Sequence, residues 1–336
     1  MNCKPYVIAE LSGNHNGDIN RAFQLIEAAK NAGASSVKLQ TYTADTMTID
    51  SKEDDFLIKK GPWMGYNLYE LYKEAHTPWE WHSELFKKAK ELEIEIFSTP
   101  FDESAVDFLE NLGVHKYKIA SFEIVDLPLI KYVAQAKKPM IISTGMANLE
   151  EITDAVETAR NNGCDNLTLL HCVSSYPAVT QDCNLFTMVD IKKRFPDVSI
   201  GLSDHTLGTV VSVAAVALGA EVIEKHITLS RSEGGVDSAF SLEPHEFKEL
   251  CDATYDAWLS LGKVNYSRAK SEIESKVFRR SIYAVEDIYP GEILTKKNIR
   301  VIRPGFGLAP KYFDKILGSK THKVYRKGER VEFDSE

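Results

Sequence analysis

Cysteine is scarce in this sequence, and the spacing of the cysteines excludes two kinds of site. The 336 residues include five of them, an odd number that forms no CxxC or HxxC pair. Neither a disulfide framework nor a zinc site is indicated, so we expect buried or free thiols. The five are Cys3, Cys164, Cys172, Cys183 and Cys251.

Long apolar runs and an excess of basic residues are also missing. No stretch approaches the roughly 18 apolar residues of a membrane span, and the first ten residues show neither a signal-peptide nor a transit-peptide pattern. We therefore expect a cytoplasmic protein that does not enter a membrane. The net charge of −9 argues against a nucleic-acid binder, which would present a basic surface.

What the sequence does contain is a regular alternation of short apolar runs and longer amphipathic segments. This pattern is typical of repeated βα units around a parallel sheet. Eight units in about 260 residues predict an α/β fold, a (β/α)₈ TIM barrel, over residues 1–262. The strands are expected to begin near Pro5, Ser36, Ile94, Lys116, Pro139, Leu167, Ser199 and Val222.

The helices of these units are expected between the strands. Glycine follows several of them, as expected where a helix ends in a left-handed residue. The clearest helical segments are residues 20–32, 79–92, 149–161, 207–218 and 244–261, and the glycines are Gly33, Gly113, Gly163 and Gly219.

The end of the chain has a different character. We expect a linker over residues 263–276 and a small, mostly irregular β-rich domain over 277–336, with strands at 281–284, 300–302 and 323–325. Residues 263–336 hold 17 Lys or Arg and 10 Asp or Glu, a net charge of +7, so the rest carries −16. Two domains of opposite net charge can dock on one another. The same charges are explained equally well if the basic domain does not dock and its charge only keeps it soluble.

One connection is much longer than the others. About 37 residues separate the second strand from the helix at Trp79, and a connection of that length is usually functional. Its aromatic residues either pack the loop on the barrel or form a wall that covers a sugar with apolar substituents. They are Trp63, Tyr66, Tyr69 and Tyr72, followed by Trp79 and Trp81.

Strand alternation turns several polar residues into the barrel. Among them are two lysines, Lys38 and Lys118, and buried lysines require a negative partner. Either one alone could be paired by Glu10 or Glu224. Two together predict a phosphate and carboxylate pocket, completed by strand-end hydroxyls. The other inward or strand-end residues are Gln40, Thr99, Ser121, Ser143, Thr144 and Ser203.

Two inward histidines, His205 and His226, end consecutive strands. A lone histidine is more often a satisfied core residue, but a converging pair beside Asp204, Glu224 and Asp237 predicts a divalent metal with nitrogen and oxygen ligands and open positions. Without cysteine in the cluster, manganese, magnesium or cobalt is expected rather than structural zinc.

Glu10 ends the first strand. It could be the ion-pair partner of Lys38 or an acid/base at the centre of the pocket. The segment after it, residues 12–17, is too small and polar to be expected in the core, and its glycines would let the backbone approach a ligand closely.

These motifs together resemble the sialic acid synthase family in order and spacing, over nearly the whole chain. They are AELSGNHNG at 9–17, STPF at 98–101, KIASFE at 118–123, STGM at 143–146, GLSDHT at 201–206 and EKH at 224–226. In the tail, VIRPG at 301–305 resembles the antifreeze-like (SAF) domain of these synthases.

Within the family, the second unit resembles the branch that makes pseudaminic acid. The matching segments are LQTYT at 39–43, DF at 55–56, GPW at 61–63, LYELY at 68–72 and WEWH at 79–82. Ser174, which precedes the pair Tyr176-Pro177, fits the same branch, because the sialic acid branch usually has Asn there.

The resemblance implies a transferase that condenses phosphoenolpyruvate, water and 2,4-diacetamido-2,4,6-trideoxy-L-altrose to pseudaminic acid and phosphate. It implies a divalent metal, first of all Mn²⁺, on His205 and His226, and Glu10 as acid/base. Phosphate and carboxylate would be held by Lys38, Thr99, Lys118, Ser121 and Ser203. The residues implied for the sugar or its surroundings are Gln40, Glu123, Ser174, Tyr176 and Asp237.

The resemblance also implies a domain-swapped homodimer, in which Arg303 of one tail reaches an acetamido group in the other subunit. Two alternatives stay open. The chain could be an N-acetylneuraminate or legionaminic acid synthase with the same barrel residues. It could instead be a non-catalytic glycan-binding module on an inert barrel, although the tail lacks a flat Thr-rich repeat.

Overall fold

The computed structural model describes residues 4–333, which form two compact units. The first ends at Gly262 and the second begins at Lys263. Residues 263–276 are exposed throughout, and their separate role as a linker stays a prediction. Cys3 and the outermost ends of both predicted domains lie outside the described residues.

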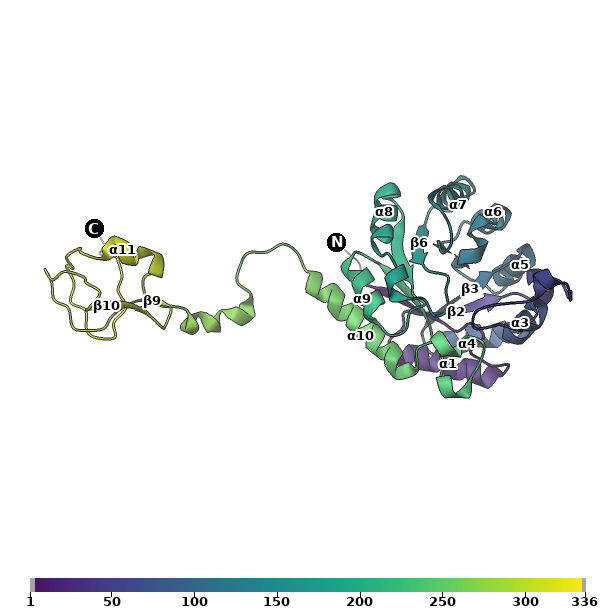
Figure 1. Ribbon diagram of the computed structural model, residues 1–336, viewed down its shortest axis with the longest axis horizontal. Helices are drawn as coiled ribbons and strands as arrows, with labels where there is room; N and C mark the ends of the chain where they lie inside the picture. The colour runs from purple at the N-terminus through teal and green to yellow at the C-terminus, as the bar shows by residue number, and fades with distance from the viewer. Residues whose placement is uncertain (1–3, 334–336) are drawn as a thin grey trace. The chain divides into compact units, whose positions relative to one another are not determined.

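Within residues 4–333, eight parallel strands close into a barrel in the order of the sequence, with β8 paired to β1. Figure 1 shows helices arranged around these strands. This confirms the predicted TIM barrel, and every strand begins within one residue of its predicted start. The strands are β1 (Tyr6–Glu10), β2 (Ser36–Thr41), β3 (Glu95–Pro100), β4 (Tyr117–Ile119), β5 (Met140–Ser143), β6 (Leu167–Cys172), β7 (Ser199–Ser203) and β8 (Val222–His226).

Helices surround the barrel and bury one face each against it. In α1 the buried residues Ala22, Leu25, Ile26 and Ala29 recur at helical spacing. The outer helices are α1 (Ile19–Ala32), α4 (His82–Glu91), α5 (Glu103–Asn111), α6 (Leu127–Gln135), α7 (Leu149–Asn161), α8 (Phe186–Arg194), α9 (Val210–Ala217) and α10 (Pro244–Leu261).

Glycine explains where several helices begin and end. All four glycines predicted to end helices have a positive φ, 94° at Gly33 for example. The helix predicted from residue 207 begins only at Val210, because Gly208 has a φ of 76° and cannot lie in a right-handed helix. The segment predicted from Trp79 opens with a 3₁₀ turn, Trp79–Trp81, before α4.

The long connection after β2 has secondary structure of its own. It contains α2 (Ala44–Met47), a 3₁₀ turn (Asp54–Phe56) and α3 (Leu68–Ala75). The return to α4 is anchored by His82, whose Nε2 lies 2.8 Å from Thr41 Oγ1 at the end of β2. The connection is therefore a folded insertion tied to the barrel at its base.

In the described part of the second unit, β9 (Ser281–Ala284) pairs antiparallel with β10 (Ile299–Ile302), and α11 (Phe313–Ile316) covers a small core that includes Ile282 and Ile299. The strand predicted at 323–325 is wrong. Tyr325 forms one bridge, to Ile288. The ladder stops there because the Arg326 N–H donates to Glu329 and the Lys323 N–H donates to Thr321.

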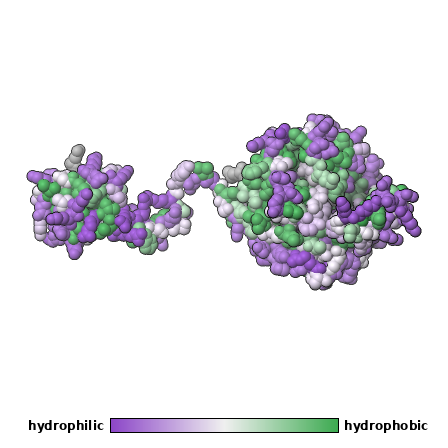
Figure 2. All heavy atoms as spheres, in the orientation of Figure 1, coloured by the Kyte–Doolittle hydropathy of each residue, from purple (hydrophilic) through white to green (hydrophobic). Residues whose placement is uncertain are grey.

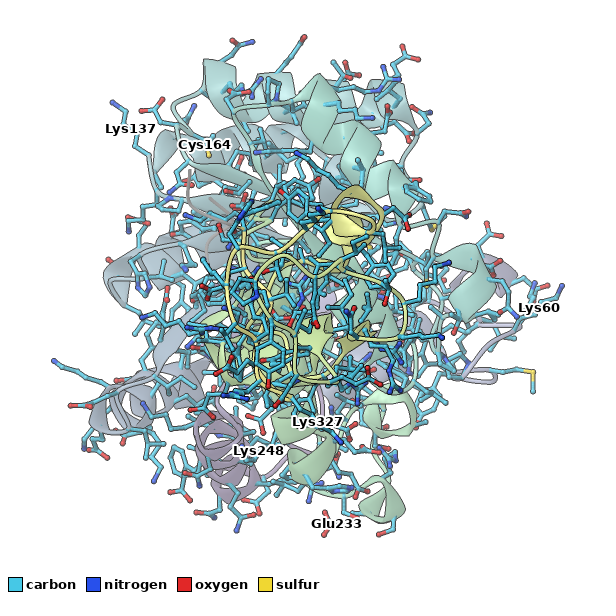
Figure 3. The ribbon with its side chains drawn as sticks, turned by 90° about the vertical axis from the view of Figure 1, so that its left-hand side faces the viewer. Lys60, Lys137, Cys164, Glu233, Lys248 and Lys327 are labelled. Carbon is cyan, nitrogen blue, oxygen red and sulfur yellow. The ribbon has the colours of Figure 1, made fainter. Side chains whose placement is uncertain are left out.

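Most charged side chains extend into solvent, and hydrophilic residues cover much of the outer rim of the barrel unit (Figure 2). Lys60 and Lys137 project outward in this way (Figure 3), and Lys248 is exposed as well. The buried lysines of the barrel are the exceptions, and each requires a partner. No helix within residues 4–333 combines the length and apolarity needed to cross a membrane.

Candidate active site

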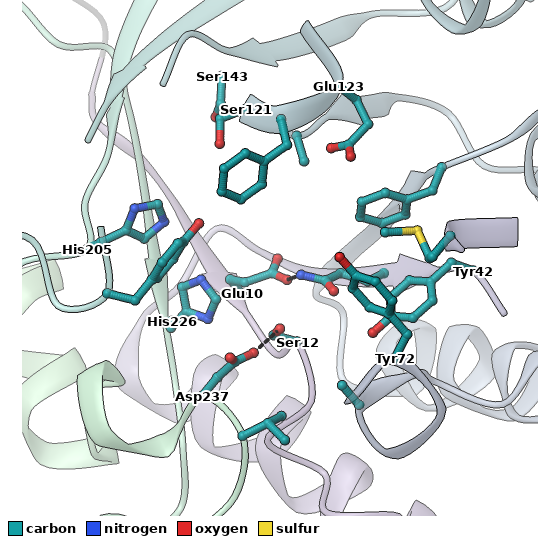
Figure 4. A pocket seen from close by; sticks show the side chains of 18 of the residues that line it. Glu10, Ser12, Tyr42, Tyr72, Ser121, Glu123, Ser143, His205, His226 and Asp237 are labelled. Atoms are coloured by element: carbon teal, nitrogen blue, oxygen red, sulfur yellow. Dashed lines mark hydrogen bonds between the residues drawn. The ribbon is translucent and has the colours of Figure 1, made fainter. Parts of the chain in front are cut away.

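A pocket of about 380 Å³ lies at the carboxyl ends of the strands, where TIM barrels carry their active sites (Figure 4). Most of the predicted site residues line it, although they come from distant parts of the chain. They are Glu10, Lys38, Gln40, Lys118, Ser121, Glu123, Tyr176, Ser203, His205, His226 and Asp237.

Both predicted lysines carry carboxylate partners in the pocket. Lys38 Nζ lies 2.9 Å from Glu10 Oε2 and 3.3 Å from Glu224 Oε1. Lys118 Nζ lies 2.9 Å from the same oxygen of Glu224. Glu224 thus bridges the two lysines. Thr99 lies behind the pocket, where it accepts a hydrogen bond from Lys38 at 3.3 Å.

The two carboxyl groups differ in their ease of ionisation. Burial opposes the charge on Glu224, but Lys118 and Lys38 outweigh it and lower its pKa to about 2. For Glu10, burial raises the pKa above its ordinary value, more than Lys38 lowers it. Gln40 donates to Glu10 Oε1 at 3.0 Å and holds it in place. One carboxylate therefore stays charged while the other is suited to carry a proton.

His205 and His226 face each other with ring centroids 5.6 Å apart. Burial lowers the pKa of both, to about 4 for His205, so both imidazoles are neutral at pH 7. The Nδ1–H of His205 donates to the Val173 carbonyl at 2.9 Å, which leaves the Nε2 lone pair available. Among the described residues, no group hydrogen-bonds the buried Nδ1 of His226.

These histidines fit a divalent cation as two neutral imidazole ligands with the remaining positions open to water or substrate. One of the predicted neighbours faces elsewhere, and another is held by a hydrogen bond. Asp204 faces away from the pocket and pairs with Lys225, and Asp237 accepts a hydrogen bond from Ser12. Within residues 4–333, no group of three or more His, Cys, Asp or Glu is placed to hold a metal. Of the three acidic residues predicted beside the histidines, Asp204 therefore faces elsewhere, while Glu224 and Asp237 line the pocket.

The predicted hydroxyl residues divide between the pocket and the layer beneath it. Ser121 and Ser143 line the pocket. Ser174 lies behind Ser121, with the two Oγ atoms 2.8 Å apart, and Thr144 points to the Leu170 carbonyl. A Cβ on Gly145 would lie 2.1 Å from Ser174 Oγ, so glycine permits this close packing.

The first four residues of the segment after β1, residues 12–15, are buried, contrary to expectation, whereas residues 16 and 17 are exposed. Asn14 and His15 are buried. A Cβ on Gly13 would lie 2.5 Å from Val236 Cγ2, so this glycine allows two loops of the protein to pack together rather than a ligand to approach. Only Ser12 of this segment lines the pocket.

With this geometry established, comparison with known proteins identifies the family. Residues 25–266 match the NeuB family, which is more than half of the chain. The chain belongs to the NeuB family. Residues 279–330 match the SAF domain. The resemblance to sialic acid synthases is thereby confirmed, in the barrel and in the tail.

Individual relatives share nearly the full length. A pseudaminic acid synthase of Helicobacter pylori is 46% identical over 96% of this chain and 95% of that protein. An N,N'-diacetyllegionaminic acid synthase of Legionella pneumophila is 40% identical over 95% and 90%. The crystal structure of N-acetylneuraminic acid synthetase from Leptospira borgpetersenii, in complex with citrate, has a TM-score of 0.72 at 33% identity, covering 81% of this chain and 90% of that one.

In this NeuB chain the long insertion supplies one wall of the pocket. Trp63 and Tyr72 line it, whereas Tyr66 and Tyr69 donate to carboxylates of the insertion and Trp79 stacks on Phe108. Part of the aromatic set therefore packs the insertion and part lines the pocket, and the contact of this wall with a sugar stays a prediction. The sequence did not single out seven further residues of the pocket wall, because the insertion and the segments after β3 and β4 show no strand alternation that would give their orientation. They are Tyr42, Met47, Ile58, Leu68, Leu71, Phe101 and Phe122.

Tyr176 connects this wall to the histidines. Its ring centroid lies 4.4 Å from that of His205 and 5.4 Å from that of Trp63. Phe240, also missed from the sequence, packs 5.1 Å from His226. Arg303 belongs to the SAF unit, where it is exposed, and its predicted contact with the sugar stays a prediction.

Proposed function

We propose that this chain is a pseudaminic acid synthase, which condenses phosphoenolpyruvate with 2,4-diacetamido-2,4,6-trideoxy-L-altrose and water to give pseudaminic acid and phosphate. The observation that carries the proposal is the pair Lys38 and Lys118, bridged by Glu224 in a barrel pocket beside two neutral histidines. The membership in the NeuB family and the full-length likeness to a pseudaminic acid synthase support it.

The lysines would bind the phosphate and carboxylate of phosphoenolpyruvate. When Glu10 holds a proton, the two ammonium groups share one carboxylate, Glu224, and this cluster of four side chains carries a net positive charge. Preorganised charge of this kind stabilises the negative charge that develops during the reaction. Hydroxyl groups of Ser121, Ser143 and Ser203 line the same pocket and can donate to the anion.

Glu10 would move the protons. C3 of phosphoenolpyruvate attacks the sugar aldehyde, and the aldehyde oxygen takes the proton of Glu10 as it becomes a hydroxyl. Water then adds at C2 and returns a proton to the Glu10 carboxylate. The bond between C2 and the phosphate oxygen then breaks, the C2 hydroxyl becomes the carbonyl of the product, and its proton leaves on the phosphate. A carboxyl with a raised pKa suits both directions of transfer.

His205 and His226 would hold the divalent cation, with Mn²⁺ first and Mg²⁺ or Co²⁺ next. When bound, the cation supplies Lewis-acid polarisation of the aldehyde. The residues around the histidines would hold the two rings in a state that can bind the cation. Val173 fixes the tautomer of His205, and the rings of Tyr176 and Phe240 pack against the histidines, where they would exclude water from one side.

The sugar would lie against the insertion wall. Its 6-methyl and acetamido methyl groups suit apolar residues such as Trp63, Leu68 and Leu71. Gln40, Glu123, Tyr176 and Asp237 offer hydrogen-bonding groups on the polar side. A legionaminic or N-acetylneuraminate synthase would differ in the residues of this wall. The lysines and histidines of the pocket would serve all three reactions.

Homodimerisation completes the proposal. Arg303 of the SAF domain would reach an acetamido group of the sugar bound in the other subunit. The net charges of +7 on residues 263–336 and −16 on the rest favour such docking. The cytoplasmic location expected from the sequence stays a prediction.

The test is phosphate release from phosphoenolpyruvate by the full chain, with and without Mn²⁺, offered the diacetamido-altrose, a legionaminic acid precursor or N-acetylmannosamine. We expect release with the first sugar and only with metal. Phosphoenolpyruvate labelled with ¹⁸O in the bridging position should yield labelled phosphate. Preference for another sugar would make the chain a different synthase of the family, and no release with any sugar would overturn the enzyme assignment.

A further inference from the structure

A second buried ion pair lies behind the histidines, on the outer side of the barrel wall. Lys225 Nζ is 2.8 Å from Asp204 Oδ2, and the side chains are 0% and 1% exposed. Neither residue lines the active-site pocket in the described structure. Burying two charges is costly, so the pair requires a reason beyond stability.

Strand alternation places this pair directly behind both histidines. On β7 and the residues after it, Ser203 and His205 face the pocket and Asp204 faces outward. On β8, Glu224 and His226 face the pocket and Lys225 faces outward. The Asp204 N–H donates to the Glu224 carbonyl at 2.9 Å, which joins the two segments at this level.

The pair also fixes the backbone on either side of His205. Asp204 Oδ1 accepts from the N–H and the hydroxyl of Thr206 at 2.9 and 2.7 Å. Lys225 Nζ donates to the Thr206 carbonyl at 2.6 Å. Ser212 in α9 donates to Asp204 Oδ2 at 2.6 Å. His205 therefore lies between two residues that the ion pair holds in place.

We propose that Lys225 and Asp204 are positioning residues that hold His205 and His226 at the separation needed for one cation. This inference rests on the metal site of the proposed function, though not on the identity of the sugar. His226 ends β8 and His205 follows β7, so they bind a common ion only if both rings are correctly placed. Contacts behind metal ligands typically change affinity about 10–100-fold.

A purely structural role makes a different prediction. Removing one member leaves an unpaired buried charge and destabilises the fold, whereas removing both relieves that charge. If the pair only stabilises β7 and β8, metal affinity should recover in the double variant together with the melting temperature. If it positions the histidines, stability should recover and affinity should not.

The experiment is calorimetric titration of Mn²⁺ into the full chain and into Lys225→Met, Asp204→Asn and the double variant. We expect the Kd to rise about 10–100-fold in all three. Lys116→Met is the matched control, because Lys116 pairs with Glu95 at 2.6 Å near the amino ends of the strands. Its Mn²⁺ affinity should equal that of the native chain.

The titrations test the positioning role of Lys225 and Asp204 separately from the proposed metal site. Native affinity in folded Asp204→Asn or Lys225→Met, or its return in the double variant, would overturn the positioning role alone. Should Lys225→Met fail to fold, Asp204→Asn decides, since asparagine keeps an acceptor for Thr206. If the native chain binds no Mn²⁺, Mg²⁺ or Co²⁺, the proposed metal site fails and the positioning role fails with it.

Discussion

Lys118 Nζ lies 2.9 Å from Glu224 Oε1 inside the barrel, and the two side chains are only 2% and 5% exposed. Burial lowers the pKa of Lys118, while Glu224 opposes that effect. A charge that is buried from solvent, where the effective dielectric constant is low, strongly attracts an anion that binds beside it. The pair is therefore where phosphoenolpyruvate binding can be tested most directly.

Lys118→Met should raise the KM for phosphoenolpyruvate at least tenfold and lower kcat by about 10²–10³. Steady-state phosphate release measures both. Lys116→Met, two residues earlier and outside the pocket, is the control and should leave the KM unchanged. An unaltered phosphoenolpyruvate KM in Lys118→Met would contradict the anion site.

Loss of either histidine should abolish metal binding. We expect His205→Ala and His226→Ala to bind no Mn²⁺ in a titration and to lose at least about 10³ in phosphate release, because the Lewis acid is missing. Circular dichroism should show a folded barrel. His245→Ala, an exposed residue of α10, should behave like the native chain. Full Mn²⁺ affinity in either pocket variant would refute the two-histidine site.

Trp63 should matter for the sugar rather than for phosphoenolpyruvate. Its indole lines the pocket and donates to the Val236 carbonyl at 2.7 Å. Trp63→Ala should raise the sugar KM about 10–100-fold, corresponding to roughly 1.4–2.7 kcal/mol of lost binding. Tyr66→Ala, in the same loop but outside the pocket wall, should have little effect. Equal rises in both substrate KM values would argue against a sugar wall.

Glu123 should make stability depend on pH. Burial raises its pKa from 4.5 to about 7. The folded chain therefore keeps a proton there that the unfolded chain has released, so stability is lost as the pH rises from about 4.5 to about 7. Relative to Glu123→Gln, the native chain should lose up to about 3 kcal/mol of unfolding free energy over this range.

Urea denaturation at pH 5 and pH 7.5 measures this difference. Glu150→Gln, at an exposed position of α7, is the control and should show no such pH-dependent difference from the native chain. A constant gap between the native chain and Glu123→Gln at both pH values would mean that Glu123 is ionised throughout.

Arg303→Ala should raise the KM for the sugar more than the KM for phosphoenolpyruvate, since the proposed contact is to an acetamido group. Arg300→Ala offers a neighbouring exposed arginine of the same unit as control. Kinetics with each substrate varied in turn give both constants. Identical effects on the two substrates would count against this role for Arg303.

Local patterns predicted the barrel closely. Strand starts fall within one residue of expectation because apolar alternation is a property of each segment alone. The inward orientation of Lys38, Lys118, His205 and His226 followed from the same alternation. The helix predicted from residue 207 began late because a single φ, at Gly208, overrides the apolar pattern.

The sequence by itself determined the barrel, the inward residues and, through its motifs, the family. Only the tertiary structure decided which charges meet. Glu224 bridges lysines that lie 106 and 186 residues earlier in the chain, and Asp204, predicted to lie beside the metal, pairs instead with Lys225. The physical reason is that alternation gives the face of a side chain, whereas its partner depends on the three-dimensional approach of other strands. Ion pairs form only between charged groups a few ångströms apart, and the distances between groups on different strands are fixed only when the barrel closes.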